Sequence, residues 1–133
     1  MLDINRSLLM SKVDSKNSTP ELIVRKLIYS LGYRYRLHRK DIPGTPDIVF
    51  SKRKKVIFVH GCFWHRHENC SKSTTPKSNV EFWINKFSTN IQRDKSNYKK
   101  LDAMGWKYLV IWECETKKSG IDVLTQKIVE FLQ

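Results

Sequence analysis

The sequence lacks a long apolar run, and this argues against two classes of protein. Among the 133 residues, no stretch approaches the ~18 consecutive apolar residues that a membrane-spanning helix needs. The N-terminal stretch Met1-Leu2-Asp3-Ile4-Asn5-Arg6 also lacks the apolar core of a signal peptide. We therefore expect an intracellular, cytoplasmic protein with no membrane partner.

Cysteine is scarce, and its number is odd. Three cysteines argue against a disulfide framework and agree with a reducing compartment. A reduced cysteine is usually a small buried apolar residue, but Cys62 and Cys70 lie in a polar window that holds three of the four histidines. Thiolates and imidazoles are the ligands that zinc prefers. We predict a zinc site of Cys62, His67 and Cys70, with Cys114 as a distant fourth ligand; His65 stays an alternative to His67.

Acidic residues are few relative to basic ones. The chain has 25 Lys and Arg against 13 Asp and Glu, a net charge of +12 and a pI of about 9.8. This balance favours a polyanionic partner such as nucleic acid, although a basic ribosomal or membrane-surface protein would show the same count. The length fits one domain. We expect a basic N-terminal arm over residues 1–17 and a single folded domain over residues 18–133.

Caps, turns and apolar periodicity predict an alternation of helices and strands. The expected elements are a helix from the Ser18 cap to Gly32, strands at 33–38, 47–50 and 55–59, a helix from a capping box at 78–81 to Gly105, a strand at 106–112 and a helix at 122–132. In the first helix, Glu21 is most simply a residue that complements the helix dipole. The hairpin of the second and third strands should bring Asp47 and His60 near each other.

This order predicts an α/β fold with a mixed central sheet flanked by helices. The αβββαβ order resembles the core of the restriction-endonuclease-like nucleases, in which a Pro-Asp pair begins a metal site at one strand end; here the pair is Pro46-Asp47. The usual carboxylate-x-lysine of the next strand is absent, and Val59-His60-Gly61 stands in its place.

Several motifs resemble one family in particular, the very-short-patch-repair (Vsr-type) DNA mismatch endonucleases of bacteria. The matching residues are Pro43-Gly44-x-Pro46-Asp47, His60-Gly61-Cys62-Phe63-Trp64-His65-x-His67, Glu81-Phe82-Trp83, Asn90, Arg93-Asp94 and Trp112-Glu113-Cys114. The resemblance implies a zinc-bearing, Mg²⁺-dependent phosphodiester hydrolase. Such an enzyme nicks one DNA strand 5′ to the thymine of a T:G mismatch left by deamination of 5-methylcytosine, which initiates very short patch repair.

The same resemblance assigns roles to individual residues. Carried over by motif, the roles are: Asp47 as Mg²⁺ ligand, helped by the backbone carbonyl of Val59; His65 as general base; His60 as the residue that orients water at the metal; Glu21 as acidic helper; Cys62, His67, Cys70 and Cys114 as structural zinc ligands; and Phe63, Trp64 and Trp83 as an aromatic wedge that enters the DNA stack. Two departures are Val59, where the family commonly has threonine, and one extra residue between His67 and Cys70.

The implied partners are double-stranded DNA with a T:G mismatch and mismatch-repair proteins, with a monomer working at the bacterial nucleoid. Two other functions stay open. The same active site could serve a restriction or defence endonuclease that acts on unmismatched DNA. A protein of a different class, a zinc-stapled DNA-binding protein without catalysis, would share the charge and the cysteines.

Overall fold

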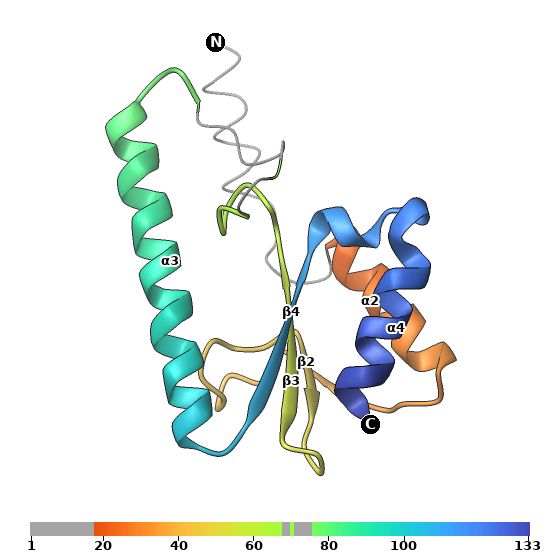
Figure 1. The fold of residues 1–133 in the computed structure, drawn as a ribbon. Coiled ribbons are helices and arrows are strands. Elements are labelled where there is room, and N and C mark those ends of the chain that lie inside the picture. Colours follow the sequence, from red (N-terminus) through yellow and green to blue (C-terminus); the bar gives the residue numbers. More distant parts are fainter. Residues whose placement is uncertain (1–17, 68–69, 71–75) are drawn as a thin grey trace.

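The computed structural model describes residues 18–67, 70 and 76–133; the arm predicted for residues 1–17 lies outside them. A central sheet separates α3 (Val80–Ala103) on one face from α2 (Thr19–Ser30) and α4 (Ile121–Leu132) on the other (Figure 1). The predicted α/β class and its flanking helices are confirmed. Within the described part of the chain, no helix combines the length and the apolar character needed to cross a bilayer.

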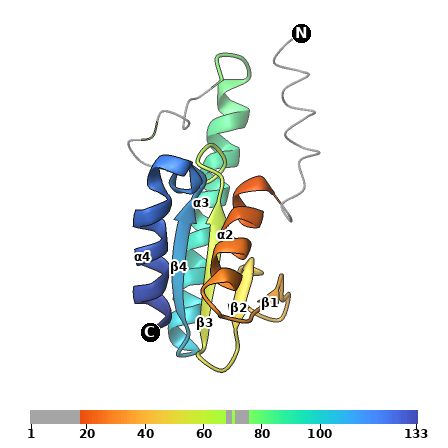
Figure 2. The same cartoon turned by 90° about the vertical axis from the view of Figure 1, so that its right-hand side faces the viewer.

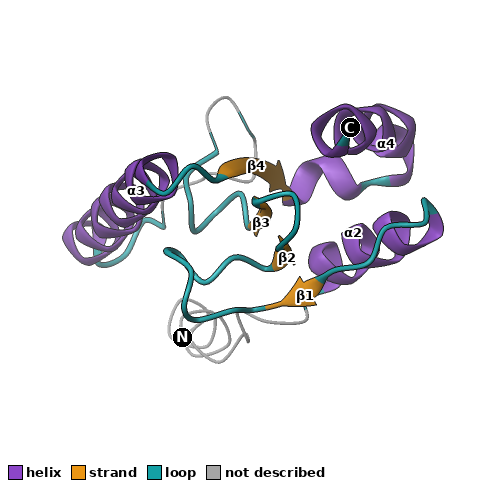
Figure 3. Cartoon of the chain, turned by 90° about the horizontal axis from the view of Figure 1, so that it is seen from below, coloured by secondary structure: helices purple, strands orange, loops and turns teal. Residues whose placement is uncertain are grey.

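The sheet is mixed and has the strand order β1-β2-β3-β4. Its strands are β1 (Arg36–Leu37), β2 (Ile48–Phe50), β3 (Lys55–His60) and β4 (Lys107–Trp112). The first three strands are antiparallel neighbours, whereas β3 and β4 run parallel, with His60 opposite Trp112. Figure 3 shows the strands in this order from below, with α2 beside β1 and β2, and α4 beside β4. The parallel pair therefore ends at one edge, where β3 passes into a loop and β4 into a short 3₁₀ helix.

Each face of the sheet carries its own apolar core. Ile48, Ile57 and Ile111 pack with the apolar sides of α2 and α4, while Val49, Val56 and Phe58 pack with Leu101 of α3. This alternation follows the two-residue period of strands. Burial on both faces explains why β2 and most of β3 read as continuous apolar runs. Figure 2, turned from Figure 1, shows α2 lying along the sheet in front of α3.

The helix ends largely follow the predicted signals. Ser18 caps α2 by accepting a hydrogen bond from the Glu21 N–H, and Gly32 follows the helix with φ +93°. The capping box predicted at Ser78 is wrong: Asn79 is the N-cap of α3, in a left-handed conformation (φ 54°), with no side-chain cap bond. Two short 3₁₀ helices, η1 (Glu113–Thr116) and η2 (Lys118–Gly120), join β4 to α4.

The strand predicted over residues 33–38 is shorter than expected. Only Arg36 and Leu37 pair with β2, opposite Val49 and Ile48. Tyr33 and Tyr35 still belong to the core, since both rings contact Phe50 edge-on with centroids 6.5 and 6.4 Å away. The aromatic residues of this segment anchor it by side-chain packing.

Candidate active site

The loop before β2 is shaped by one glycine. Gly44 has φ +83°, and a Cβ on it would lie 2.9 Å from the ring of Phe58. Glycine is therefore required both for the backbone conformation and for the close approach. This packing fixes the segment that leads through Pro46 into Asp47 at the start of β2.

Asp47 lies in a buried group with Glu21 and His38. Ligand atoms of the three side chains lie within 4.8 Å of one another. The Nε2 atom of His38 is 2.9 Å from Oε2 of Glu21, and Nη1 of Arg25 is 3.4 Å from the same oxygen. Glu21 is only 1% exposed, so its carboxylate lies within this group, and its place in the first turn of α2 also complements the helix dipole, as predicted.

The carboxyl group of Asp47 is electrostatically strained. Burial, followed by the nearby charge of Glu21, raises the pKa of Asp47 to about 7, against the lowering effect of a hydrogen bond from the Val59 N–H. That hydrogen bond, 2.7 Å from N to Oδ2, ties Asp47 to β3. Two carboxylates that lie this close together are typical of a site for a hard divalent cation.

A second group is formed by His60, His65 and Asp94, whose ligand atoms also lie within 4.8 Å of one another. The two imidazoles stack, with centroids 3.8 Å apart and planes 6° from parallel. Nδ1 of His65 lies 2.6 Å from Oδ2 of Asp94 on α3. Because an ionised carboxylate can only accept a hydrogen bond, Nδ1 is the donor, and in the neutral ring Nε2 of His65 is left as an acceptor.

His60 is held as a neutral imidazole. Burial first, and the neighbouring His65 second, lower the pKa of His60 to about 3. Its Nδ1 atom is buried and has no hydrogen-bond partner among the described residues. A buried nitrogen without a hydrogen bond destabilises the fold unless a ligand or a water molecule supplies that bond. The environment of His60 therefore suits a residue that contacts a bound water.

The end of β3 connects the two groups. The Val59 N–H binds Asp47, and the next residue, His60, stacks on His65. Consecutive strand residues point to opposite faces, and the cores confirm this here, because Val59 packs on the α2 side while His60 contacts Phe58 and Tyr98 on the α3 side. Asp47 therefore contacts the residue that directly precedes His60 at this strand end; a direct approach of Asp47 to the His60 ring stays a prediction.

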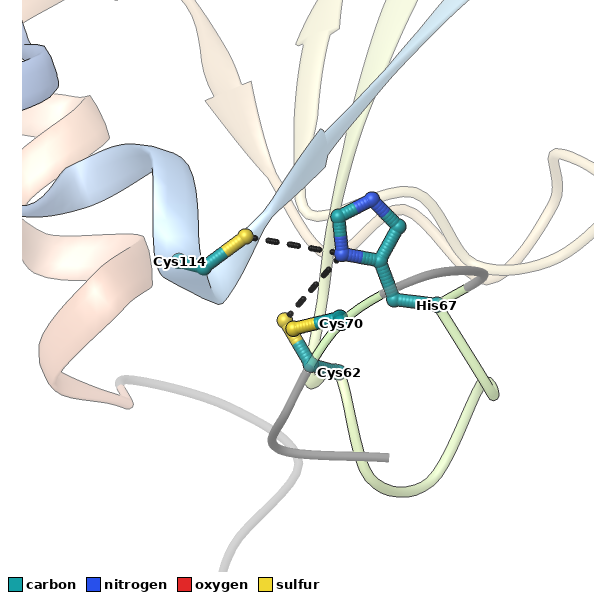
Figure 4. Close-up of side chains that lie close together, drawn as sticks. All are labelled: Cys62, His67, Cys70 and Cys114. Atoms are coloured by element: carbon teal, nitrogen blue, oxygen red, sulfur yellow. Dashed lines mark hydrogen bonds between the residues drawn. The ribbon is translucent and has the colours of Figure 1, made fainter. Parts of the chain in front are cut away.

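A third group unites the three cysteines with one histidine. Cys62, His67, Cys70 and Cys114 converge, the first three from the loop after β3 and Cys114 from η1 after β4 (Figure 4). Nδ1 of His67 lies 3.6 Å from Sγ of Cys62 and 3.4 Å from Sγ of Cys114. With zinc bonds of about 2.3 Å to sulfur and about 2.0 Å to nitrogen, tetrahedral ligands lie roughly 3.5 Å apart. The spacing fits zinc.

Further contacts fix this loop. The ring of His67 stacks on Trp112, with centroids 4.3 Å apart, and Oε1 of Glu113 accepts a hydrogen bond from the Cys62 N–H. Burial raises the pKa of the Cys62 thiol to about 12, so the thiol is neutral without a cation, whereas a bound zinc ion would favour the thiolate. His65 is separate from the cysteines and belongs to the second group.

The aromatic residues predicted to enter DNA form a small core of their own. Phe63 contacts Trp64, Trp83 and Phe87, with ring centroids 5.2, 5.5 and 5.2 Å away. Phe63 and Trp83 are 7% and 6% exposed, so both rings are buried in this structure. The cause is α3, which lays Trp83 and Phe87 over the loop; Trp64 is only partly buried.

Three contributing residues were not assigned a role from the sequence. Asp94 and Asn90 lie one helical turn apart on α3, where Asn90 donates a hydrogen bond to the Trp64 carbonyl, 3.1 Å away. Both belonged to the motif match, and their spacing places them on one helix face. In the sequence, His38 is one polar residue of an alternating strand pattern. Its place in the acidic group is seen only from its contact with Glu21 in the structure.

Comparison with solved structures supports the fold. The catalytic domain of the homing endonuclease I-Bth0305I superposes with a TM-score of 0.57 at 22% sequence identity, covering 86% of this chain and 94% of that domain. At this identity the similarity shows the fold alone, which is a restriction-endonuclease-like one.

Comparison with sequences supports the family. The family model of the DNA mismatch endonuclease Vsr matches residues 2–72. A type II nicking enzyme of Xanthomonas oryzae, V.XorIIP, is 51% identical over 86% of this chain and 84% of its own length. The DNA mismatch endonuclease Vsr of Escherichia coli is 32% identical over 96% of this chain and 83% of its own. With the acid, imidazole and cysteine groups in place, these matches show that the chain is a DNA endonuclease and belongs to the Vsr mismatch endonuclease family.

Proposed function

We propose that this endonuclease nicks one strand of duplex DNA 5′ to the thymine of a T:G mismatch and thereby starts very short patch repair at the nucleoid. The observation that carries the proposal is that the end of β3 contacts both groups: the Val59 N–H binds Asp47, and the next residue, His60, stacks on His65. The Escherichia coli relative is a DNA mismatch endonuclease and the Xanthomonas relative a nicking enzyme, which supports the same reaction here.

Asp47, the backbone carbonyl of Val59 and Glu21 would hold Mg²⁺. When bound, Mg²⁺ stabilises the negative charge that develops on the phosphate. The neutral Nε2 of His65 accepts the proton of the attacking water, while Asp94 stabilises the resulting imidazolium through its 2.6 Å contact with Nδ1. His60 cannot compete for that proton because its pKa is about 3; it orients the water instead.

Zinc, held by the four residues of the cysteine group, would stabilise the loop that carries both His65 and the aromatic residues. The binding free energy of such a site contributes directly to folding. Phe63, Trp64 and Trp83 would form the wedge beside the mismatch, since unstacking a base step needs a large rigid apolar group. Trp64 is the partly buried member of the three, so it is the one most accessible to a base step.

A strand-specific nicking assay tests this function. The substrates are T:G, T:A and C:G duplexes of otherwise identical sequence, with each strand labelled in turn and Mg²⁺ present. We expect a single nick in the thymine strand of T:G. Asp47→Ala and His65→Ala should each remove nicking, with binding retained. Asp102→Asn, at an exposed position of α3, is the matched control and should nick normally.

Two results would reject the proposal. Equal cutting of both strands in paired duplexes would identify a restriction-type endonuclease. Binding without any cutting by the unmodified protein, in several flanking sequences, would identify a non-catalytic DNA-binding protein. One set of catalytic groups per chain suits a monomer that cuts one strand, and mismatch-repair proteins are the partners that such a product would require.

A further inference from the structure

His38 occupies an unusual position in the fold. It directly follows β1, and its backbone lies in the left-handed region with φ 49°. Few residues other than glycine adopt this conformation, and it often marks a functional position. The conformation is held in place because the His38 N–H donates a hydrogen bond to the carbonyl of Asp47, 3.3 Å away.

The turn at His38 directs its ring onto the first turn of α2. Nε2 lies 2.9 Å from Oε2 of Glu21, and the side chain is 14% exposed. His38 thus contacts one acid through its backbone and the other through its imidazole. Three separate elements, the start of α2, the end of β1 and the start of β2, converge on one point.

The distances fit a shared ion. Two cis ligands of an octahedral ion with bonds of about 2.1 Å lie roughly 3 Å apart, close to the 2.9 Å between Nε2 and Oε2. A ligand oxygen of Asp47 lies within 4.8 Å of a ligand atom of Glu21 and of a ligand atom of His38. An ion at this point would also offset the repulsion between the two carboxylates, which contributes to the raised pKa of Asp47.

We propose that His38 is a nitrogen ligand of the catalytic cation, and that the site therefore binds Mn²⁺ more tightly than Mg²⁺. This inference rests on the proposed function, because it concerns the same cation. Mg²⁺ prefers ligands that are all oxygen, whereas imidazole nitrogen suits first-row transition ions. Neutral imidazole ligates through Nε2 when its proton is on Nδ1, so binding requires the tautomer that does not donate to Glu21.

Pulsed electron paramagnetic resonance on the zinc-loaded protein tests the ligand directly, because a bound ¹⁴N couples magnetically to Mn²⁺. We expect this coupling in the unmodified protein and its loss in His38→Asn, since asparagine tolerates left-handed backbone. His65→Gln is the matched control and should keep the coupling. His38→Gln replaces His38→Asn if the latter does not fold.

Competition titrations of Mn²⁺ against Mg²⁺ give the second readout. We expect the preference for Mn²⁺ to fall about 10-fold or more in His38→Asn, a loss typical of a removed contact at a metal site. A ¹⁴N coupling that survives in the His38 variants, its absence from the unmodified protein, or an unchanged Mn²⁺ preference would overturn the inference. None of these results depends on nicking, so failure of the T:G assay would reject the proposed function separately.

Discussion

Asp47 is a carboxylic acid held where its negative charge is poorly tolerated. Its side chain is buried beside Glu21 and is anchored by the Val59 N–H. An active site commonly keeps such an unfavourable charge because the reaction needs it. Stability and function therefore make opposite demands on this position.

Asp47→Asn should stabilise the protein while removing its activity. In the folded protein the pKa of Asp47 is about 7, against an ordinary value of 3.8, so folding favours the protonated form of this acid. The stability that the protonated form contributes is lost as the pH rises from about 4 through 7. Asparagine carries no charge and can still accept from Val59. Without added Mg²⁺ at pH 8, we expect a melting temperature higher by about 5 °C, as roughly 1–2 kcal/mol would give.

Thermal melts at pH 5 and pH 8 check this prediction. The difference between variant and unmodified protein should shrink toward pH 5 and also when Mg²⁺ is added at pH 8. Asp102→Asn removes an exposed acid on α3 and should show neither effect. A variant that melts lower than the unmodified protein at pH 8 would contradict the reading of Asp47 as electrostatically strained.

Asp94→Asn should slow nicking about 100-fold without weakening DNA binding. The amide cannot stabilise an imidazolium as the carboxylate 2.6 Å from His65 does, and it permits the wrong tautomer. Single-turnover nicking rates and separately measured dissociation constants check this. A large loss of binding, with an unchanged rate at saturation, would show that Asp94 supports the DNA contact instead.

For individual residues, the sequence predicts which side chains could bind a metal better than it predicts what surrounds them. Paired cysteines around histidines, and the Pro46-Asp47 dipeptide, were visible as motifs. The role of His38 was not, because its partner Glu21 is 17 residues away. The burial of Phe63 was also invisible, since it depends on how α3 crosses the loop.

Among the elements, β3 and β4 end beside the same proposed zinc site. Their parallel pairing ends at His60 and Trp112, and directly beyond these residues stand Cys62 and Cys114. A zinc ion bound there would join the two strand ends and support Trp112, on which His67 stacks. Most element types and spans were predictable from periodicity and caps, whereas the start of α3 and the length of β1 depended on tertiary contacts.

Cys114→Ser should abolish zinc binding and strongly destabilise the fold. A hydroxyl is a poor zinc ligand at neutral pH, and a structural zinc contributes on the order of 10 kcal/mol of binding free energy. We expect about one zinc per chain in the unmodified protein, none in the variant, and a melting transition that is lowered by at least 10 °C or lost. Elemental analysis and thermal melts measure both. A variant that keeps its zinc would remove Cys114 from the ligand set.

At the scale of the whole molecule, the net charge of +12 predicted a polyanion without saying which one. The motif resemblance and the matched relatives supplied that answer. Charge acts over the entire surface and carries little information about sequence or mismatch. We therefore expect specificity to come from contacts with the bases and not from the net charge.

DNA affinity should depend steeply on salt, and mismatch preference should not. If the protein neutralises six to ten phosphates, binding weakens about 10³- to 10⁵-fold between 50 and 200 mM salt. The ratio of T:G to T:A affinity should change far less, because base contacts release few counterions. Fluorescence anisotropy titrations at several salt concentrations measure both. Salt-independent binding would argue against a backbone-dominated interface.

The placement of Val59 and His60 on opposite faces of β3 limits how this gene can change in length. Inserting or deleting one codon within Lys55–His60 would exchange the two faces, turning His60 away from His65 and the apolar residues into the wrong core. The turn at 51–54, at the other end of the same strand, carries exposed residues. A peptide tag or a short fusion placed there should leave the enzyme intact.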